Sequence, residues 1–302
     1  MSVAELEARE VQIDQAGGGG GLWADAWRRL RRDPGFWVGT MLVSLFVLVA
    51  LLAPVLAPYG PREQLGLASA FDGPSSSHWL GLDELSRDEY SRILWGARYS
   101  LIIGVVSVAV GLSIGLVLGA TAGYLGGWVD TVIMRSMDVM LSIPGFLMAV
   151  GIVALLGPGL WQIMIAVGVV NVPIFARLLR GSVLAQREND FVLAARAIGV
   201  PKRTILSSHI LPNAISPVIV QGTLALATAI IDVAGLGFLG LGPQDPATPE
   251  WGTMLSGVNR YFQSGPHLAL APGFAIVMSV LGFNLIGDAL REALDPKLRG
   301  RA

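Results

Sequence analysis

Six long apolar stretches, separated by polar segments, set the pattern of hydrophobic and polar positions along this chain. Each is long enough to cross the hydrocarbon core of a bilayer as an α-helix, which needs about 20 residues. The stretches are residues 36–57, 101–122, 128–156, 160–179, 215–241 and 266–287. The pattern therefore predicts an all-α, polytopic membrane protein with six transmembrane helices.

The N-terminal part of the chain, up to the end of the first apolar stretch, consists of two segments. Residues 1–21 are acidic at first and end in a run of five glycines, which predicts a disordered N-terminus and linker rather than a signal peptide. Within residues 22–58, Trp23, Trp27 and Leu30 share one helical face among arginines, and the first span follows. We expect a basic amphipathic helix on the membrane surface, ended by Pro34. A partner-binding helix is the alternative, which the span that follows at once makes less favourable.

Glycines recur at every fourth position in the second span. Residues this far apart lie on one helix face, and small residues there let another helix approach closely in lipid. The positions are Gly111, Gly115, Gly119 and Gly123. We expect this face to pack closely, either in a functional crossing of the core or as ordinary tight packing.

Polar residues and prolines interrupt three of the spans. Pro144 is expected to kink the third span. Asn171 lies within the fourth span and Asp232 within the fifth. A carboxylate inside a membrane segment is costly unless it is paired or faces water, so Asp232 marks either a functional site or a position shallow enough to reach the interface. Asp232 and Asn171 are therefore candidates for a pore or polar pathway.

The longest polar interruption in the second half of the chain is residues 187–213. Phe191, Ala195 and Ile198 fall at helical spacing and predict a small apolar face. Gly199 is suited to end that helix in the left-handed conformation, and Pro201 is suited to open the next. We therefore expect two short helices joined by a tight bend and held against the membrane.

Composition narrows the chemistry that the chain can perform. It is 53% hydrophobic and 14% charged, with a formal net charge of −1, so it offers no basic field for nucleic acid. There is no cysteine, and the three histidines lie far apart. Neither of the two lysines lies in a glycine-rich phosphate loop. We expect no metal, no cofactor and no catalytic residue in this chain, so any ATP is hydrolysed by another polypeptide.

The distribution of basic residues predicts the orientation. Arginines and lysines cluster before the first span, after the fourth and after the last, whereas residues 59–98 hold more acids than bases. The positive-inside rule then places both termini, the tail 291–302 and the loop 187–213 in the cytoplasm, and residues 59–98 outside.

The loop 187–213 resembles the EAA loop of ABC importer permeases. The matching positions are Ala194, Ala195, Gly199, Leu211 and Pro212. Leu193 stands where that family has Glu, and His209 where Ile is usual. The resemblance implies that the loop is a coupling helix that docks into a groove on a separate ATPase subunit, with Phe191 and Arg196 also at this surface.

Two further segments resemble the dipeptide/oligopeptide branch of that family. In residues 78–101 the matches are Leu80, Gly81, Asp83, Arg87, Asp88, Ser91, Arg92, Gly96, Arg98, Ser100 and Leu101. Leu82 and Ser86 depart from the pattern. In residues 237–255 the matches are residues 238–242, Pro249, Trp251, Gly252, Met254 and Leu255, and Gly237 replaces a Ser.

The resemblance covers all but the first twenty or so residues. It implies a DppC/OppC-like subunit with the ABC importer type I permease fold, whose core, residues 99–290, holds five transmembrane helices. It also implies a homologous second permease as heterodimer partner, two ATP-binding subunits that carry ATP and Mg, and an extracytoplasmic peptide-binding protein. The expected location is the bacterial inner or plasma membrane, and the expected cargo is dipeptides or oligopeptides.

Other functions remain open at this point. The same architecture also imports nickel or other small solutes. A proton-driven secondary transporter would need paired ionisable groups at mid-membrane, for which Asp232 is the one good position. An intramembrane enzyme is disfavoured, because neither an HExxH zinc motif nor a GxSxG elbow occurs in the sequence.

Overall fold

The computed structural model describes residues 22–66, 70–245, 247–258, 262–263 and 265–294. The predicted linker, residues 1–21, and residues 295–302 of the predicted tail lie outside the described residues. The described part of the chain is built of helices joined by loops, with an isolated bridge between Leu82 and Asp88. The predicted all-α class is confirmed.

Among the described residues, five helices are long and apolar enough to cross a membrane. They are α3 (Pro34–Leu56), α4 (Glu89–Leu125), α7 (Leu160–Arg187), α11 (Ser216–Phe238) and α13 (His267–Leu294). A sixth span results if α5 (Gly127–Leu141) and α6 (Gly145–Leu156) are counted as one broken crossing. The predicted number of six therefore depends on this pair.

The break between α5 and α6 is sharper than the predicted kink. The two helix axes differ by 89°. Pro144 has no N–H to donate and its ring blocks the preceding turn, so it stands at the N-cap of α6 instead of inside a continuous helix. Two helices thus replace the single bent span that the sequence predicts.

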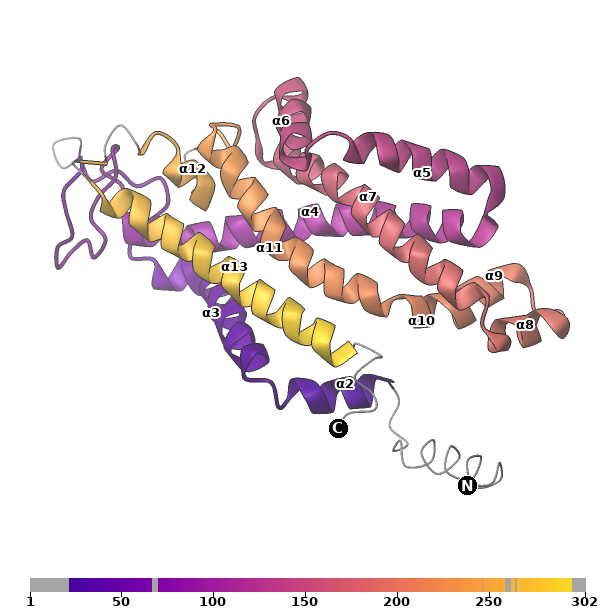
Figure 1. Cartoon of the computed structure of the whole chain (residues 1–302). Coiled ribbons are helices and arrows are strands. Elements are labelled where there is room, and N and C mark those ends of the chain that lie inside the picture. Colours follow the sequence, from indigo (N-terminus) through magenta and orange to yellow (C-terminus); the bar gives the residue numbers. More distant parts are fainter. Residues whose placement is uncertain (1–21, 67–69, 246, 259–261, 264, 295–302) are drawn as a thin grey trace.

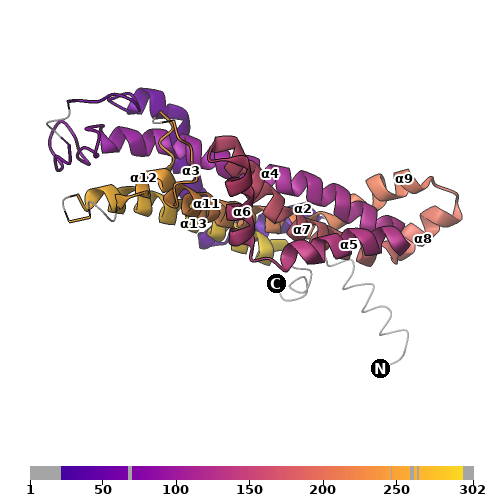
Figure 2. The same ribbon diagram turned by 90° about the horizontal axis from the view of Figure 1, so that it is seen from above.

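The long helices run between two opposite ends of the molecule (Figure 1). One end holds residues 57–66 and 70–88 and the short helix α12 (Trp251–Leu255), and the other holds α8 (Asp190–Ala197) and α9 (Lys202–Thr204). We call these the outer end and the inner end, following the predicted orientation. The view from above in Figure 2 shows the same separation of the two ends.

Helices α4 and α7 cross with their backbones in close approach. A Cβ atom added to Gly111 would lie 2.6 Å from the carbonyl oxygen of Gly168, and one added to Gly119 would overlap the carbonyl oxygen of Ala176. Gly115 and Gly123 also face α7. All four glycines of the predicted stripe therefore lie in a helix crossing within this chain. The main hydrophobic core is formed around it by α4, α6, α7, α8 and α11.

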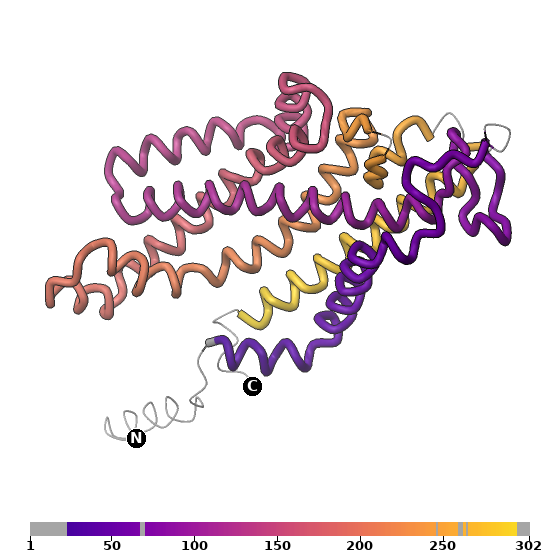
Figure 3. Tube along the Cα trace, turned by 180° about the vertical axis from the view of Figure 1, so that it is seen from behind, coloured from indigo at the N-terminus to yellow at the C-terminus, as the bar shows by residue number. Residues whose placement is uncertain are grey.

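Helix α4 begins earlier than the sequence predicts. Asp88 is its N-cap and accepts a hydrogen bond from the N–H of Ser91, so the helix starts at Glu89. The last ten residues of the predicted loop 59–98 are therefore helical. The outer part of α4 lies beside residues 70–88 at the outer end (Figure 3).

The N-terminal helix α2 (Leu22–Leu30) divides its apolar residues between two surroundings. Ala26 and Leu30 are buried against Ala289 and Ala293 of α13. Trp23 and Trp27, by contrast, are about half exposed. Of the three residues predicted to share one face, Leu30 is therefore buried, whereas Trp23 and Trp27 are exposed.

Candidate functional site

The segment after α7 folds as two short helical pieces around a tight bend. Helix α8 ends where Gly199 adopts a left-handed conformation with φ +80°. The N–H of Gly199 donates to the Arg196 carbonyl, and the N–H of Val200 donates to that of Ala195. Pro201 then precedes α9. Glycine suits position 199 because an L side chain would be strained in the left-handed conformation.

A short π-helix, η2 (Ile205–Ile210), follows α9 and leads into α10 (Leu211–Ala214). The sequence did not predict it. Because a π-helix closes its hydrogen bonds over five residues rather than four, it shifts the side-chain register. In this register Ile205 and Ile210 are both buried in the main core, beside the inner face of α8.

The faces of α8 differ from the predicted arrangement. Val192 and Ala195 point inward and are buried in the main core. Phe191 and Ile198, predicted to share a face with Ala195, are exposed instead, with Ile198 81% accessible. Leu193 is also half exposed. The helix therefore presents an apolar surface outward, although Ala195 itself does not belong to it.

The other predicted coupling residues lie around this surface. Ala194, Arg196 and Gly199 are exposed, Pro212 is exposed on α10 and Leu211 is half-buried. Lys202 and Arg203 are exposed on the adjoining turn, so the surface is apolar with a basic margin. We call the exposed residues of this segment the coupling surface: Phe191, Leu193, Ala194, Arg196, Ile198, Gly199, Lys202 and Arg203.

A groove of about 770 Å³ opens next to the coupling surface. Phe191 belongs to both, because its ring also lines the groove. The remaining walls come from α7, α10, α11 and α13, and their polar members are Ser182, Gln186, Asn213, Ser216, Gln221 and Arg291. Sequence reasoning missed this groove, because its residues come from five separate helices. The signal that could have found it is the repeated occurrence of polar residues near the inner ends of apolar helices.

The two residues proposed for a polar pathway are not brought together. Asn171 is buried in the α4–α7 crossing, close to Gly111, and its amide donates to the Val167 carbonyl at 2.8 Å. This placement favours a packing role for Asn171 over the predicted pathway role. Asp232 lies on α11 in its last two turns, toward the outer end, and is half-buried. Within the described residues no hydrogen bond or ion pair to its carboxylate is found.

Ion pairs connect α5 to the inner half of α7. Arg180 pairs with Asp130, with Nη2 and Oδ2 2.6 Å apart, and Arg177 pairs with Asp138. The Asp130 side chain is part-buried, whereas that of Asp138 is more exposed. The contacts join α5 to the helix that leads directly into α8.

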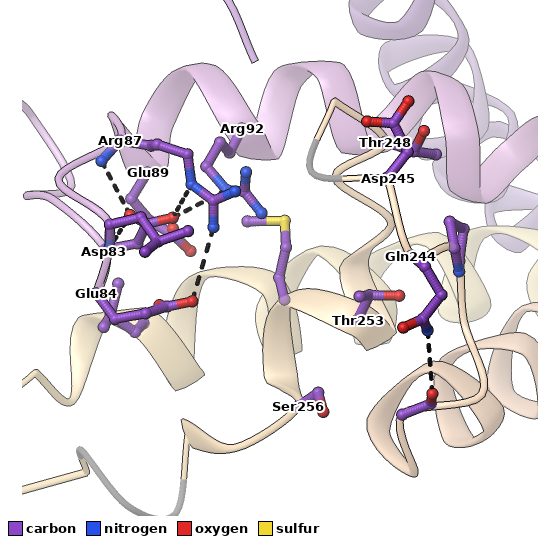
Figure 4. A pocket seen from close by; sticks show the side chains of 15 residues that line it. Asp83, Glu84, Arg87, Glu89, Arg92, Gln244, Asp245, Thr248, Thr253 and Ser256 are labelled. Atoms are coloured by element: carbon purple, nitrogen blue, oxygen red, sulfur yellow. Dashed lines mark hydrogen bonds and ion pairs between the residues drawn. The ribbon is translucent and has the colours of Figure 1, made fainter. Parts of the chain in front are cut away.

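The outer end contains a buried cluster of charges around Asp83. Its Oδ2 accepts a hydrogen bond from Nε of Arg87 at 2.7 Å and lies 3.3 Å from Nε of Arg92. All three side chains are less than a tenth exposed. Figure 4 shows both guanidinium groups directed toward Asp83 at one side of a cavity of about 300 Å³.

A second buried carboxylate joins α12 to the rest of the outer end. Glu250 caps α12 by accepting from the N–H groups of Gly252 and Thr253, each at 2.8 Å. It also accepts from the hydroxyl of Ser100 on α4, which in turn accepts from the N–H of Trp251. Burial raises the pKa of the Glu250 carboxyl, against the opposing effect of the backbone donors. In the part of the chain that the structure describes, no three His, Asp or Glu side chains gather as metal ligands.

Comparison with known proteins gives consistent matches. Residues 115–300 match the model of the binding-protein-dependent transport system inner membrane component, and residues 21–74 match that of the N-terminal TM domain of oligopeptide transport permease C. The dipeptide transport system permease protein DppC of Alkalihalophilus pseudofirmus is 47% identical over 92% of this chain and 90% of its own length. The glutathione transport system permease protein GsiD of Escherichia coli is 45% identical over 92% of this chain and 91% of its own.

The fold also matches a solved structure. The MetNI methionine ABC transporter in inward-facing conformations aligns with a TM-score of 0.55, covering 68% of this chain and 96% of the matched chain. The sequence identity is 20%, so this likeness concerns the fold alone.

Proposed function

The chain belongs to the family of binding-protein-dependent transport system inner membrane components, and we propose that it is the pore-forming permease subunit of an ATP-driven importer of dipeptides or similar short peptides. The names of its relatives, which are dipeptide and glutathione permeases, support this class of cargo. Nickel or another small solute is the alternative cargo for the same architecture.

The observation that carries the proposal is the coupling surface on α8. Ile198 is 81% exposed and Leu193 and Phe191 are about half exposed, at the tip of the molecule beyond the long helices. Apolar side chains displayed together on a short polar-flanked helix are typical of a protein interface. Because the sequence has no phosphate-binding loop of its own, a soluble ATPase subunit is the partner that this surface would serve.

The packing suggests how movement at α8 would reach the membrane. Val192 and Ala195 fix the inner face of α8 in the same core as the end of α7. Helix α7 is in turn held against α4 at the glycine crossing, where the backbones touch. A displacement of α8 would therefore move α7 and α4 together, as one rigid pair, rather than bend a single helix.

The assembly proposed around this subunit has four further parts. A homologous second permease completes the pore, two ATP-binding subunits with ATP and Mg dock at the inner end, and an extracytoplasmic peptide-binding protein delivers cargo at the outer end. In this arrangement both termini lie in the cytoplasm of a bacterial cell and the chain is a non-catalytic pore subunit. The groove beside α8, with its polar lining, is a candidate for the inner part of the pathway.

Ile198→Asp tests the proposal on the importer assembled with its partner subunits. A charge in the centre of an apolar contact should weaken docking by a factor of at least ten without disturbing the fold, since this side chain is exposed. The measurements are retention of the ATPase subunits during purification and uptake of a labelled dipeptide, with nickel uptake measured in parallel.

Leu239→Asp is the matched control, because Leu239 is an exposed leucine just after α11 at the outer end. It should leave retention of the ATPase subunits unchanged. If Ile198→Asp retains the ATPase subunits and transports as well as the wild type, the coupling surface has been assigned wrongly.

A further inference from the structure

The corner between α2 and α3 is held in one conformation by contacts within the chain. Asp33 caps α3 by accepting from the N–H groups of Gly35 at 2.6 Å and Phe36 at 3.2 Å. The indole N–H of Trp37 donates to the Arg31 carbonyl at 3.1 Å. Pro34 is the first helical residue of α3, so the span begins immediately after this corner. The backbone of the corner is therefore held at the boundary of the apolar span.

One side of the corner is already occupied by the last helix. Ala26 and Leu30 of α2 are buried against Ala289 and Ala293 of α13. Phe36 packs beside this contact, and its ring meets that of Trp27 edge to face at 6.2 Å. Because one face of α2 packs on α13, the opposite face of α2 is exposed.

The outward side combines indole rings with positive charge. Trp23, Trp27 and Trp37 are 53%, 50% and 50% exposed. Arg31 and Arg32 are exposed at the corner itself, and neither pairs with an acidic side chain in the part of the chain that the structure describes. Arg28 differs, because it pairs with Asp25.

We propose that this corner binds the headgroup of an anionic phospholipid. Two arginines directly before a membrane span lie at the depth of the lipid phosphates, where a polybasic segment attracts negative headgroups. Half-exposed tryptophans are the side chains that favour the same interfacial layer, since their rings are apolar and their N–H groups are polar. A bound headgroup would lie beside the contact between α2 and α13, because the two arginines directly follow Leu30, and would so stabilise the attachment of the first helix to the last.

The proposal concerns a lipid and not a free anion or a protein partner. A free phosphate would use the arginines but not the three indoles, whereas a phospholipid uses both. The proposal requires that the chain lies in a membrane, as its family of inner membrane components does. It does not depend on which cargo is transported.

Lipid retention by the purified, assembled importer tests the proposal. Native mass spectrometry would count phosphatidylglycerol and phosphatidylcholine that remain bound after detergent exchange. Each arginine near an anionic surface contributes about a fivefold gain in binding. The double variant Arg31→Gln with Arg32→Gln is therefore expected to lower phosphatidylglycerol affinity by about 25-fold, and phosphatidylcholine binding should not change.

Two controls complete the design. Arg62→Gln removes an exposed arginine at the outer end and should leave lipid retention as it is. Replacing both corner arginines with lysine should restore most of the preference, because the charge is kept. The proposal is overturned if the glutamine variant retains phosphatidylglycerol like the wild type, or if glycerol phosphate displaces the lipid at equal concentration.

Discussion

At the outer end of the bundle, charged groups are buried beside one another, whereas at the inner end apolar groups are exposed. Asp83 is enclosed with Arg87 and Arg92, and Glu250 with the backbone of α12. At the inner end Ile198 and Leu193 face outward from α8. The buried charges at the outer end pair within this chain, whereas the exposed apolar side chains of α8 at the inner end are available to another molecule.

Because of this difference, we expect substitutions at the two ends to affect different properties: the stability of the subunit in one case and its association with partners in the other. A buried ion pair that loses one partner leaves an uncompensated charge in a low-dielectric surrounding. An exposed apolar side chain contributes little to the stability of its own chain, so its loss is felt in association. Substitutions of the buried charges at the outer end should therefore destabilise the subunit, and substitutions of the exposed apolar residues of α8 should uncouple it.

The largest expected effect is that of Asp83→Ala. It leaves two buried guanidinium groups without their shared carboxylate, which is expected to cost about 3–5 kcal/mol of stability. The cost should be measured as thermal unfolding of the purified importer, or as a loss of subunit from the membrane. Asp245→Ala is the control, because its ion pair with Arg62 lies on the exposed surface of the same end.

Equal effects of these two substitutions would contradict the comparison. It would mean that the cluster around Asp83 is hydrated, and that the outer end is no more sealed than the surface around it. The expected result is instead that Asp245→Ala has little measurable effect, as is usual for exposed ion pairs.

A smaller effect is expected in the crossing that joins the two ends. A Cβ at Gly119 overlaps the backbone carbonyl of Ala176, so Gly119→Ala must separate α4 from α7 and should cost about 1–3 kcal/mol. Gly181→Ala is the matched control on α7, where a Cβ meets nothing within 4 Å. That substitution should stabilise the helix by about 0.5–1 kcal/mol, since alanine is the better helix former.

The two variants should also be compared for transport per assembled importer. If the crossing carries movement from α8 into the bundle, Gly119→Ala should lower transport more than its melting temperature alone explains. Opposite signs in the unfolding measurement are the central expectation. A destabilising Gly181→Ala would contradict it, because helix propensity alone favours alanine at an open position.

The sequence predicted those features that depend on local pattern. Hydropathy located the spans, because a membrane helix needs a long apolar run. The spacing of four residues located the glycine face, and Gly199 with Pro201 located the bend. Each of these follows from residues near one another in the chain.

The features that the sequence did not predict depend on contacts between distant segments. Helix α8 buries Val192 and Ala195 in the same core that holds Ile205 and Ile210 of the π-helix. The groove needs residues from five helices. Glu250 lies in a polar, proline-rich segment that suggests exposure. It is nevertheless buried, and its carboxylate is hydrogen-bonded to Ser100 of α4, which is 150 positions earlier in the chain.

The smallest expected effect concerns the pH dependence of stability at the outer end. Burial raises the pKa of Glu250 above its ordinary value. Between the ordinary glutamate pKa, about 4.3, and the raised pKa of the folded state, the native protein binds more protons than the unfolded chain. Stability therefore falls as pH rises through this window. Glu250→Gln, which cannot ionise, should remove this contribution to the pH slope.

Ser100→Ala provides a control in the opposite direction. It removes a hydrogen bond that favours the charged carboxylate, while Glu250 remains able to titrate, so the slope should become steeper. Melting temperatures of the assembled importer across the pH range would measure both. If Glu250→Gln leaves the slope unchanged, the carboxylate is ionised in contact with water in the native state. The outer end would then be open where the structure has it closed, and its contrast with the inner end would rest on the Asp83 cluster alone.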